Sequence, residues 1–155
     1  MLSHKLFLKR LAVLVPLVFM LGCKEDNPSE PPQPKCPCVS GPPEITFTHV
    51  PAMGSDENLS GCVCIASAQE YALAVFIKVG VSWWTKPYWA SPKTEINEDG
   101  SWECDVTTGG LDRRATEFMV YLIPENYDPP LAYGDYALPA ALDSIAVAKA
   151  QVKRQ

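Results

Sequence analysis

The chain has 155 residues and a formal net charge of −5, with three of its basic residues in the first ten positions. Residues 23–155 therefore hold 10 basic and 18 acidic residues, a formal charge of −8. Such a surface repels phosphate backbones and anionic lipid headgroups, so nucleic-acid binding is not expected. The length suits one domain of ordinary size with an N-terminal extension.

The N-terminus has the form of an export signal. Residues 1–10 carry basic side chains and no acid, and residues 11–22 are apolar and uncharged. This apolar run is shorter than the roughly 20 residues that a transmembrane helix needs. We therefore predict that residues 1–22 are a secretory signal peptide.

The end of this segment, Met20-Leu21-Gly22-Cys23, resembles the lipobox of bacterial lipoproteins, although Met20 stands where Leu is usual. The resemblance implies a type II signal peptide, with acyl groups such as palmitate attached at Cys23. Two or more acyl chains suffice for stable membrane anchoring. Lys24 follows where an Asp would indicate inner-membrane retention, so the outer membrane is the expected location. The alternative is an ordinary signal peptide that happens to contain a cysteine.

Residues 24–43 contain seven prolines and almost no large apolar side chain. Such a segment buries too little surface to offset the entropy of ordering it, so we predict an extended spacer. At about 3 Å per residue it could hold a domain several tens of Å from the bilayer. The expected organisation is a signal peptide (1–22), a lipidated cysteine with a Pro-rich tether (23–43) and one domain (44–155).

Residues 44–155 show the two-residue periodicity of β-strands. Residues 72–79 and 117–123 are the clearest strands, and the first should be a central strand with one face in the core. Residues 45–49, 61–66 and 102–107 are shorter candidates. Residues 145–152 read as a closing strand, with a helix as the alternative, and residues 139–144 could form one helical turn.

Turn signals separate these segments. Asn97-Glu98-Asp99-Gly100 predicts a hairpin turn, and Gly109-Gly110 and Pro129-Pro130 break the chain again. We therefore predict a mainly β fold. It should be a single immunoglobulin-like or fibronectin-III-like antiparallel β-sandwich with at most one short helix.

Three short segments resemble an accessory module of secreted bacterial proteins, sometimes found beside glycoside hydrolases. They are Trp83-Trp84-Thr85-Lys86-Pro87, Asp99-Gly100-Ser101-Trp102 and Thr108-Gly109-Gly110-Leu111-Asp112. The resemblance covers residues 60–154 and implies a β-sandwich of this WWxKP type. It implies no activity.

Five cysteines follow Cys23, and export would place them in an oxidising compartment where disulfides are the default. Two Cys-x-Cys pairs each present both sulfurs on one side of an extended chain. We expect one or two disulfides to join the pairs; the four candidates are Cys36, Cys38, Cys62 and Cys64. A four-thiolate metal site is the alternative, but one residue between ligands is a tight spacing for zinc. Cys104 shares a face with Trp102 and Val106 and should be a buried thiol.

Residues 81–92 hold three of the four tryptophans. Because they follow the strongest strand and include two prolines, we expect a loop at one end of the sandwich. Exposed aromatic planes can stack on sugars, peptides or another protein. The alternative is that these rings only seal the end of a small core. The candidate ligand-binding residues are Trp83, Trp84, Lys86, Tyr88 and Trp89.

Catalytic signatures are not recognisable. Residues 23–155 contain one histidine, His49, and neither a phosphate-binding glycine motif nor a His-rich metal signature. Asp112 would give Ca²⁺ too few oxygens and should cap a turn. A sandwich of this size should also have little room for a deep cleft.

We therefore predict a non-catalytic, membrane-anchored module, without cofactor or metal, that binds a glycan or protein through its aromatic segment. The main alternative is a structural or assembly lipoprotein without a small-molecule ligand. A small hydrolase or a cysteine-based metal binder is more remote.

Overall fold

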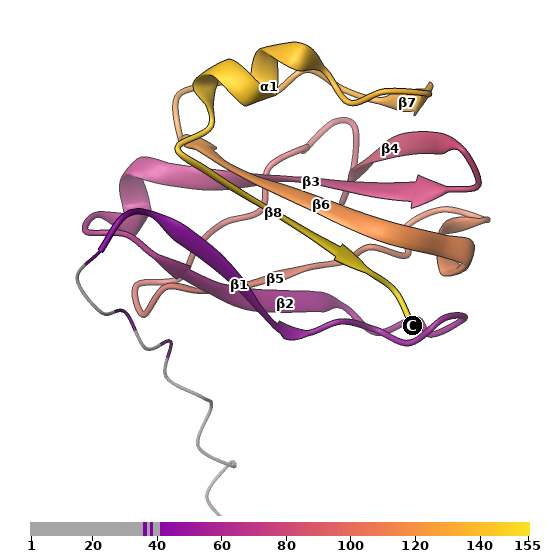
Figure 1. Cartoon of the computed structure of the whole chain (residues 1–155), viewed down its shortest axis with the longest axis horizontal. Coiled ribbons are helices and arrows are strands. Elements are labelled where there is room, and N and C mark those ends of the chain that lie inside the picture. Colours follow the sequence, from indigo (N-terminus) through magenta and orange to yellow (C-terminus); the bar gives the residue numbers. More distant parts are fainter. Residues whose placement is uncertain (1–35, 37, 39–40) are drawn as a thin grey trace, which may run out of the picture. The chain divides into compact units, whose positions relative to one another are not determined.

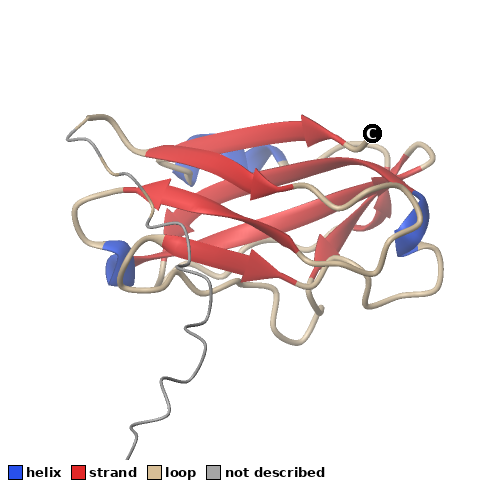
Figure 2. Cartoon of the chain, turned by 90° about the horizontal axis from the view of Figure 1, so that it is seen from below, coloured by secondary structure: helices blue, strands red, loops and turns tan. Residues whose placement is uncertain are grey.

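The computed structural model describes Cys36, Cys38 and residues 41–155 (Figure 1). The expectations about the signal peptide, Cys23 and most of the tether lie outside the described residues. The described part forms two antiparallel sheets that lie in separate layers, with one short α-helix (Figures 1 and 2). The predicted β-sandwich is thus confirmed. Within these residues, no helix is both long and apolar enough to cross a membrane.

The smaller sheet has the order β1-β2-β5, and the larger sheet has the order β7-β4-β3-β6-β8. The strands of the smaller sheet are β1 (Glu44–His49), β2 (Leu59–Cys64) and β5 (Ser101–Cys104). Those of the larger sheet are β3 (Tyr71–Val79), β4 (Ser82–Lys86), β6 (Ala115–Pro124), β7 (Tyr133–Asp135) and β8 (Ala148–Lys153). The helical elements are η1 (Ala68–Glu70), η2 (Asp112–Arg114) and α1 (Ala140–Ile145). The way the chain alternates between the sheets follows the predicted immunoglobulin-like or fibronectin-III-like type.

The main core lies between the two sheets and is centred on β3 and Trp102. Leu73, Val75 and Ile77 alternate along β3 and are completely buried there. Trp102 packs edge-on against Phe47, with 6.0 Å between ring centroids. Its indole also lies against the backbone of β2, because Gly61 stands where a Cβ would come within 2.6 Å of the ring.

A second core covers the opposite face of the larger sheet. Ala74 and Phe76 of β3 are buried there beneath Leu142 of α1, which lies over this sheet on the side away from β1, β2 and β5 (Figure 1). The prediction that only one face of residues 72–79 would lie in the core was therefore wrong. β3 is the middle strand of five, and the connection between β6 and β8 returns across its outer face.

The C-terminal segment and the Asp-Gly turn each depart in part from the sequence prediction. Residues 145–152 are divided between the end of α1 and the strand β8. Residues 97–100 do form a turn, closed by the Gly100 N–H donating to the Asn97 carbonyl at 2.9 Å. They do not link two paired strands, because β5 pairs with β2.

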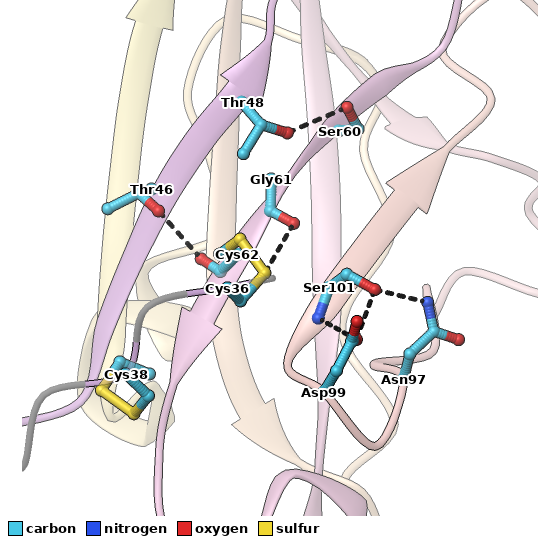
Figure 3. Close-up of a disulfide and its surroundings, with 11 residues drawn as sticks. Cys36, Cys38, Thr46, Thr48, Ser60, Gly61, Cys62, Asn97, Asp99 and Ser101 are labelled. Carbon is cyan, nitrogen blue, oxygen red and sulfur yellow. Dashed lines mark hydrogen bonds between the residues drawn. A yellow bond between two sulfur atoms is a disulfide. The ribbon is translucent and has the colours of Figure 1, made fainter. Parts of the chain in front are cut away.

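Within this turn, two hydrogen bonds from Ser101 to the Asp99 carboxylate lower the pKa of Asp99 (Figure 3).

Two disulfides attach the end of the tether to β2. They join Cys36 to Cys62 and Cys38 to Cys64 (Figure 3). Val63 lies between the two β2 cysteines and faces the core, so both disulfides lie on the outer side of the smaller sheet. The prediction that disulfides join the two Cys-x-Cys pairs is confirmed. Cys104 is a free, buried thiol, as expected.

Candidate functional site

The aromatic segment begins as a strand, so the prediction of a loop over residues 81–92 was wrong for its first half. β4 pairs with β3 on one side and with β7 on the other. A tight turn at Gly80, whose φ is +62°, connects β3 to β4. Because this turn is short, β4 lies directly beside β3 and pairs with it. The loop expected from the two prolines starts only at Pro87, and residues 88–91 form a tight turn.

Because β4 is extended, Trp83 and Trp84 lie on opposite faces of the sheet. Trp83 is only 7% exposed and belongs to the second core, together with Phe76 and Tyr121. Trp84 is half-buried and packs against the main core. The structure therefore separates Trp83 from the other four candidate residues.

Trp84, Lys86, Tyr88 and Trp89 line one pocket with a volume of about 540 Å³. Its other wall is the segment between β5 and β6, from Thr108 to Asp112. Two of the three segments that carry the family resemblance therefore meet here. The volume falls within the range of small-molecule sites, so the sandwich does have room for a pocket of that size. The remaining lining residues are Val79, Ser82, Thr85 and Pro87.

The pocket has exposed aromatic rings on its rim. Tyr88 and Trp89 are 55% and 52% exposed. The ring of Trp89 lies 4.9 Å from that of Tyr133 in β7, at an interplanar angle of 60°. Gly134 lets β7 pass close to Trp84, since a Cβ there would lie 3.0 Å from the indole. Trp84 thus packs against the backbone of β7, and Trp89 packs against Tyr133 while keeping part of its surface in solvent.

Exposed apolar side chains are concentrated around this site. Eight large apolar side chains are exposed in the described part of the chain. Three of them, Tyr88, Trp89 and Leu111, line the pocket, and Tyr133 contacts Trp89. A cluster of this kind marks an interaction surface more often than isolated exposed residues do.

A buried ion pair joins the two walls of the pocket. Lys86 of β4 contacts Asp112 of η2, and their side chains are only 6% and 11% exposed. Lys86 also donates to Thr108 Oγ1 at 3.0 Å, and the Thr108 hydroxyl donates to the Pro87 carbonyl at 2.6 Å. Each buried charge is tolerable because the other compensates it.

Asp112 also holds the turn before it, because Gly109 N–H donates to its Oδ2 at 2.5 Å. The expectation that Asp112 caps a turn therefore agrees with the geometry, but its partner Lys86 was missed. The only sequence signal was that Lys86 and Asp112 occur in two of the segments that carry the resemblance.

Arg154, directly after β8, connects η2 to the segment around Pro51. Arg154 donates to the carbonyls of Pro51 at 2.8 Å and Arg113 at 3.1 Å, and burial lowers the pKa of its guanidinium.

Few ionisable side chains line the pocket. Its titratable lining residues are Lys86, Tyr88 and Asp112, and neither histidine nor cysteine is among the described residues that line it. His49 lies elsewhere, at the end of β1, with its Nε2 3.4 Å from Glu57.

No protein-family model matches the chain, and no match is found among curated proteins or solved structures. The fold and the site themselves define the class: a β-sandwich protein with an aromatic-lined pocket between β4 and the β5–β6 connection.

Proposed function

We propose that this chain is a membrane-anchored bacterial lipoprotein whose non-catalytic β-sandwich binds a glycan or a protein through the aromatic pocket. One observation carries the proposal. Four of the five residues nominated from the sequence, Trp84, Lys86, Tyr88 and Trp89, line a single pocket.

The physical argument is that exposing aromatic surface to water is energetically unfavourable. Tyr88 and Trp89 leave about half of their surface in water, although burial of such rings is strongly favourable. A loop that only sealed the core would tend to bury them. Tyrosine and tryptophan are also the residues most enriched at the energetic centres of binding sites.

The proposed anchor is the lipid on Cys23, with the outer membrane as its destination. The tether would join the sandwich through the disulfides on β2, near Gly100, whose carbonyl accepts from Val63 N–H at 2.8 Å. Gly100 precedes β5, whereas Thr108 to Asp112 of the pocket wall follow it. The disulfides and the pocket therefore lie near opposite ends of β5. This separation supports a binding site that stays open to ligands while the tether end faces the bilayer.

A structural or assembly lipoprotein is the second candidate. Tyr136 is 83% exposed and Val81 is also exposed, although neither lines the pocket. Apolar surface outside the pocket suits contact with a partner subunit as well as it suits a small ligand.

The test is a comparison of Trp89→Ala with Tyr136→Ala in the full-length protein, purified in a detergent without a sugar headgroup. Each protein is screened on a glycan array and in pull-downs from envelope extract. We expect the Trp89 variant to lose the ligand that the wild type retains, and the Tyr136 variant to keep it. Retention of all ligands by Trp89→Ala would contradict the proposal.

A further inference from the structure

We infer that the aromatic pocket binds the ring of an uncharged sugar and that a vicinal diol of this ring meets Lys86 and Asp112. The inference rests on the proposed binding function and narrows it from "glycan or protein" to one chemical class. Three features of the pocket carry it: its charge balance, its unused hydrogen-bonding groups and its aromatic rim.

Charge balance argues for a neutral ligand. Among the lining residues, Lys86 is the only cation and Asp112 the only carboxylate, and they form a pair with each other. An anionic ligand would have to compete with Asp112 for Lys86, and a cationic ligand would have to compete with Lys86 for Asp112. Separating a buried pair leaves one charge without compensation, which is strongly unfavourable.

Hydrogen-bond accounting argues for hydroxyl groups. The Lys86 ammonium has three N–H groups, of which two are directed to Thr108 Oγ1 and Asp112 Oδ2. Oδ2 of Asp112 also accepts from Gly109 N–H, whereas Oδ1 accepts no hydrogen bond from the described residues. The pair therefore has one N–H and one carboxylate oxygen without a hydrogen-bond partner among the described residues. Two adjacent hydroxyls satisfy both, because one can accept while the other donates.

The aromatic rim argues for a ring with an apolar face. Trp89 and Tyr133 form a tilted pair, and Tyr88 is exposed beside them on the lining. The C–H face of a pyranose can pack on such rings while its hydroxyls point toward polar groups. Access from the other wall is open at Gly110, where a Cβ would have no atom within 4 Å.

A proline-rich peptide is the nearest competitor, because aromatic grooves also bind polyproline II helices. Such a peptide offers carbonyl acceptors but no N–H at its prolines. It could use the free N–H of Lys86, but its prolines would leave Oδ1 of Asp112 without a donor. A diol satisfies both groups, so the observations favour the sugar.

The experiment measures binding to the full-length protein in the same detergent, by calorimetry and tryptophan fluorescence. The probes are neutral hexaoses of glucose, mannose, xylose and N-acetylglucosamine, an oligogalacturonate, and an oligoproline peptide. We expect at least one neutral hexaose to bind, and neither the oligogalacturonate nor the peptide to do so. The same hexaose with its vicinal hydroxyls methylated should bind at least about tenfold more weakly, since the methylated oxygens can no longer donate to Asp112 and the added methyl groups crowd the Lys86–Asp112 pair.

The methylated ligand tests the inference on the unaltered protein, so it does not depend on whether a pocket variant folds. Trp89→Ala should weaken binding of the hexaose at least about tenfold, and the control Tyr136→Ala should leave it unchanged. Equal binding of the methylated hexaose, or failure of every neutral hexaose, would overturn the inference. If the peptide or the oligogalacturonate binds instead and Trp89→Ala abolishes that binding, the sugar assignment fails while the proposed binding function stands. If the pull-downs also show no dependence on Trp89, both fail.

Discussion

Lys86 and Asp112 lie 26 residues apart in the sequence and meet as a buried ion pair that joins the two walls of the aromatic pocket. One comes from the end of β4 and the other from the start of η2. The contact fixes the distance between two segments that share no strand pairing. The shape of the pocket therefore depends on this pair as much as on the aromatic rings.

Lys86→Met should lower the free energy of unfolding by about 3–5 kcal/mol, because it leaves the Asp112 carboxylate buried without its cation. The double variant Lys86→Met, Asp112→Leu should recover much of that loss. Urea denaturation measures both. Lys149→Met is the matched control: its ion pair with Asp143 is exposed, so solvent screens it and its loss should change the stability little. Single and double variants of equal stability would contradict a structural ion pair.

Trp83→Ala and Trp89→Ala should behave differently although both remove an indole. Trp83 is buried in the second core, so its loss should cost about 3–5 kcal/mol. Trp89 is half exposed, and its loss should cost less than about 1 kcal/mol. Thermal melts of the two variants decide this, and a large destabilisation by Trp89→Ala would show that the ring is structural.

Disulfide connectivity can be tested with paired serine variants. Cys36→Ser with Cys62→Ser should leave the other disulfide, Cys38–Cys64, intact. Cys36→Ser with Cys64→Ser should instead leave two mismatched cysteines as free thiols in the folded protein. Thiol counting by mass spectrometry without reductant distinguishes them. Each lost disulfide should also cost about 2–4 kcal/mol of stability, because the unfolded chain regains conformational freedom.

Stability should fall at alkaline pH because of Cys104. Burial raises the pKa of this thiol to about 12, compared with 9.0 for an unperturbed thiol. Above pH 9 the unfolded chain loses this proton while the folded chain keeps it. The free energy of unfolding should therefore decrease by up to about 1.4 kcal/mol per pH unit between the two pKa values.

The control for this prediction is Cys104→Ala, measured by urea denaturation between pH 8 and pH 10.5 beside the wild type. Other groups titrate in this range in both proteins, so the difference between the two slopes isolates the thiol. Identical slopes would mean that Cys104 is deprotonated as easily in the folded state as in the unfolded state.

Cys23→Ser should abolish acylation and leave unprocessed precursor, because the thiol is the proposed acceptor of the lipid. Metabolic labelling with palmitate measures this directly. Cys104→Ser is a suitable control, since it removes a different cysteine and should leave the label unchanged. Undiminished labelling of the Cys23 variant would rule out the lipid anchor.

Local periodicity was sufficient for the strongest strands and for the chemistry of the cysteines. Residues 72–79 and 117–123 alternate with a period of two, and neighbouring residues in a strand face opposite sides. The same alternation placed both sulfurs of each Cys-x-Cys pair on one side, which favoured disulfides between the two pairs, and the structure decided which cysteine joins which. These inferences needed only residue type and short-range spacing along the chain.

β4 shows where local reasoning failed. Its tryptophans and the prolines that follow it suggested a loop, but pairing with β3 across the Gly80 turn supplies hydrogen bonds that outweigh the local signal. The second core was missed for a related reason. Ala74 and Phe76 are buried by α1, which follows them by more than 60 residues.

The sequence by itself determined the class of fold, the cysteines that form disulfides and the aromatic residues that deserve testing, because each depends on residue type and short-range spacing. Only the tertiary structure decided that Trp83 belongs to the core while Trp84, Lys86, Tyr88 and Trp89 line one pocket. It also decided that Asp112 neutralises Lys86 there. The physical reason is that burial and ion pairing depend on which distant segments pack together, and spacing along the chain does not specify that packing.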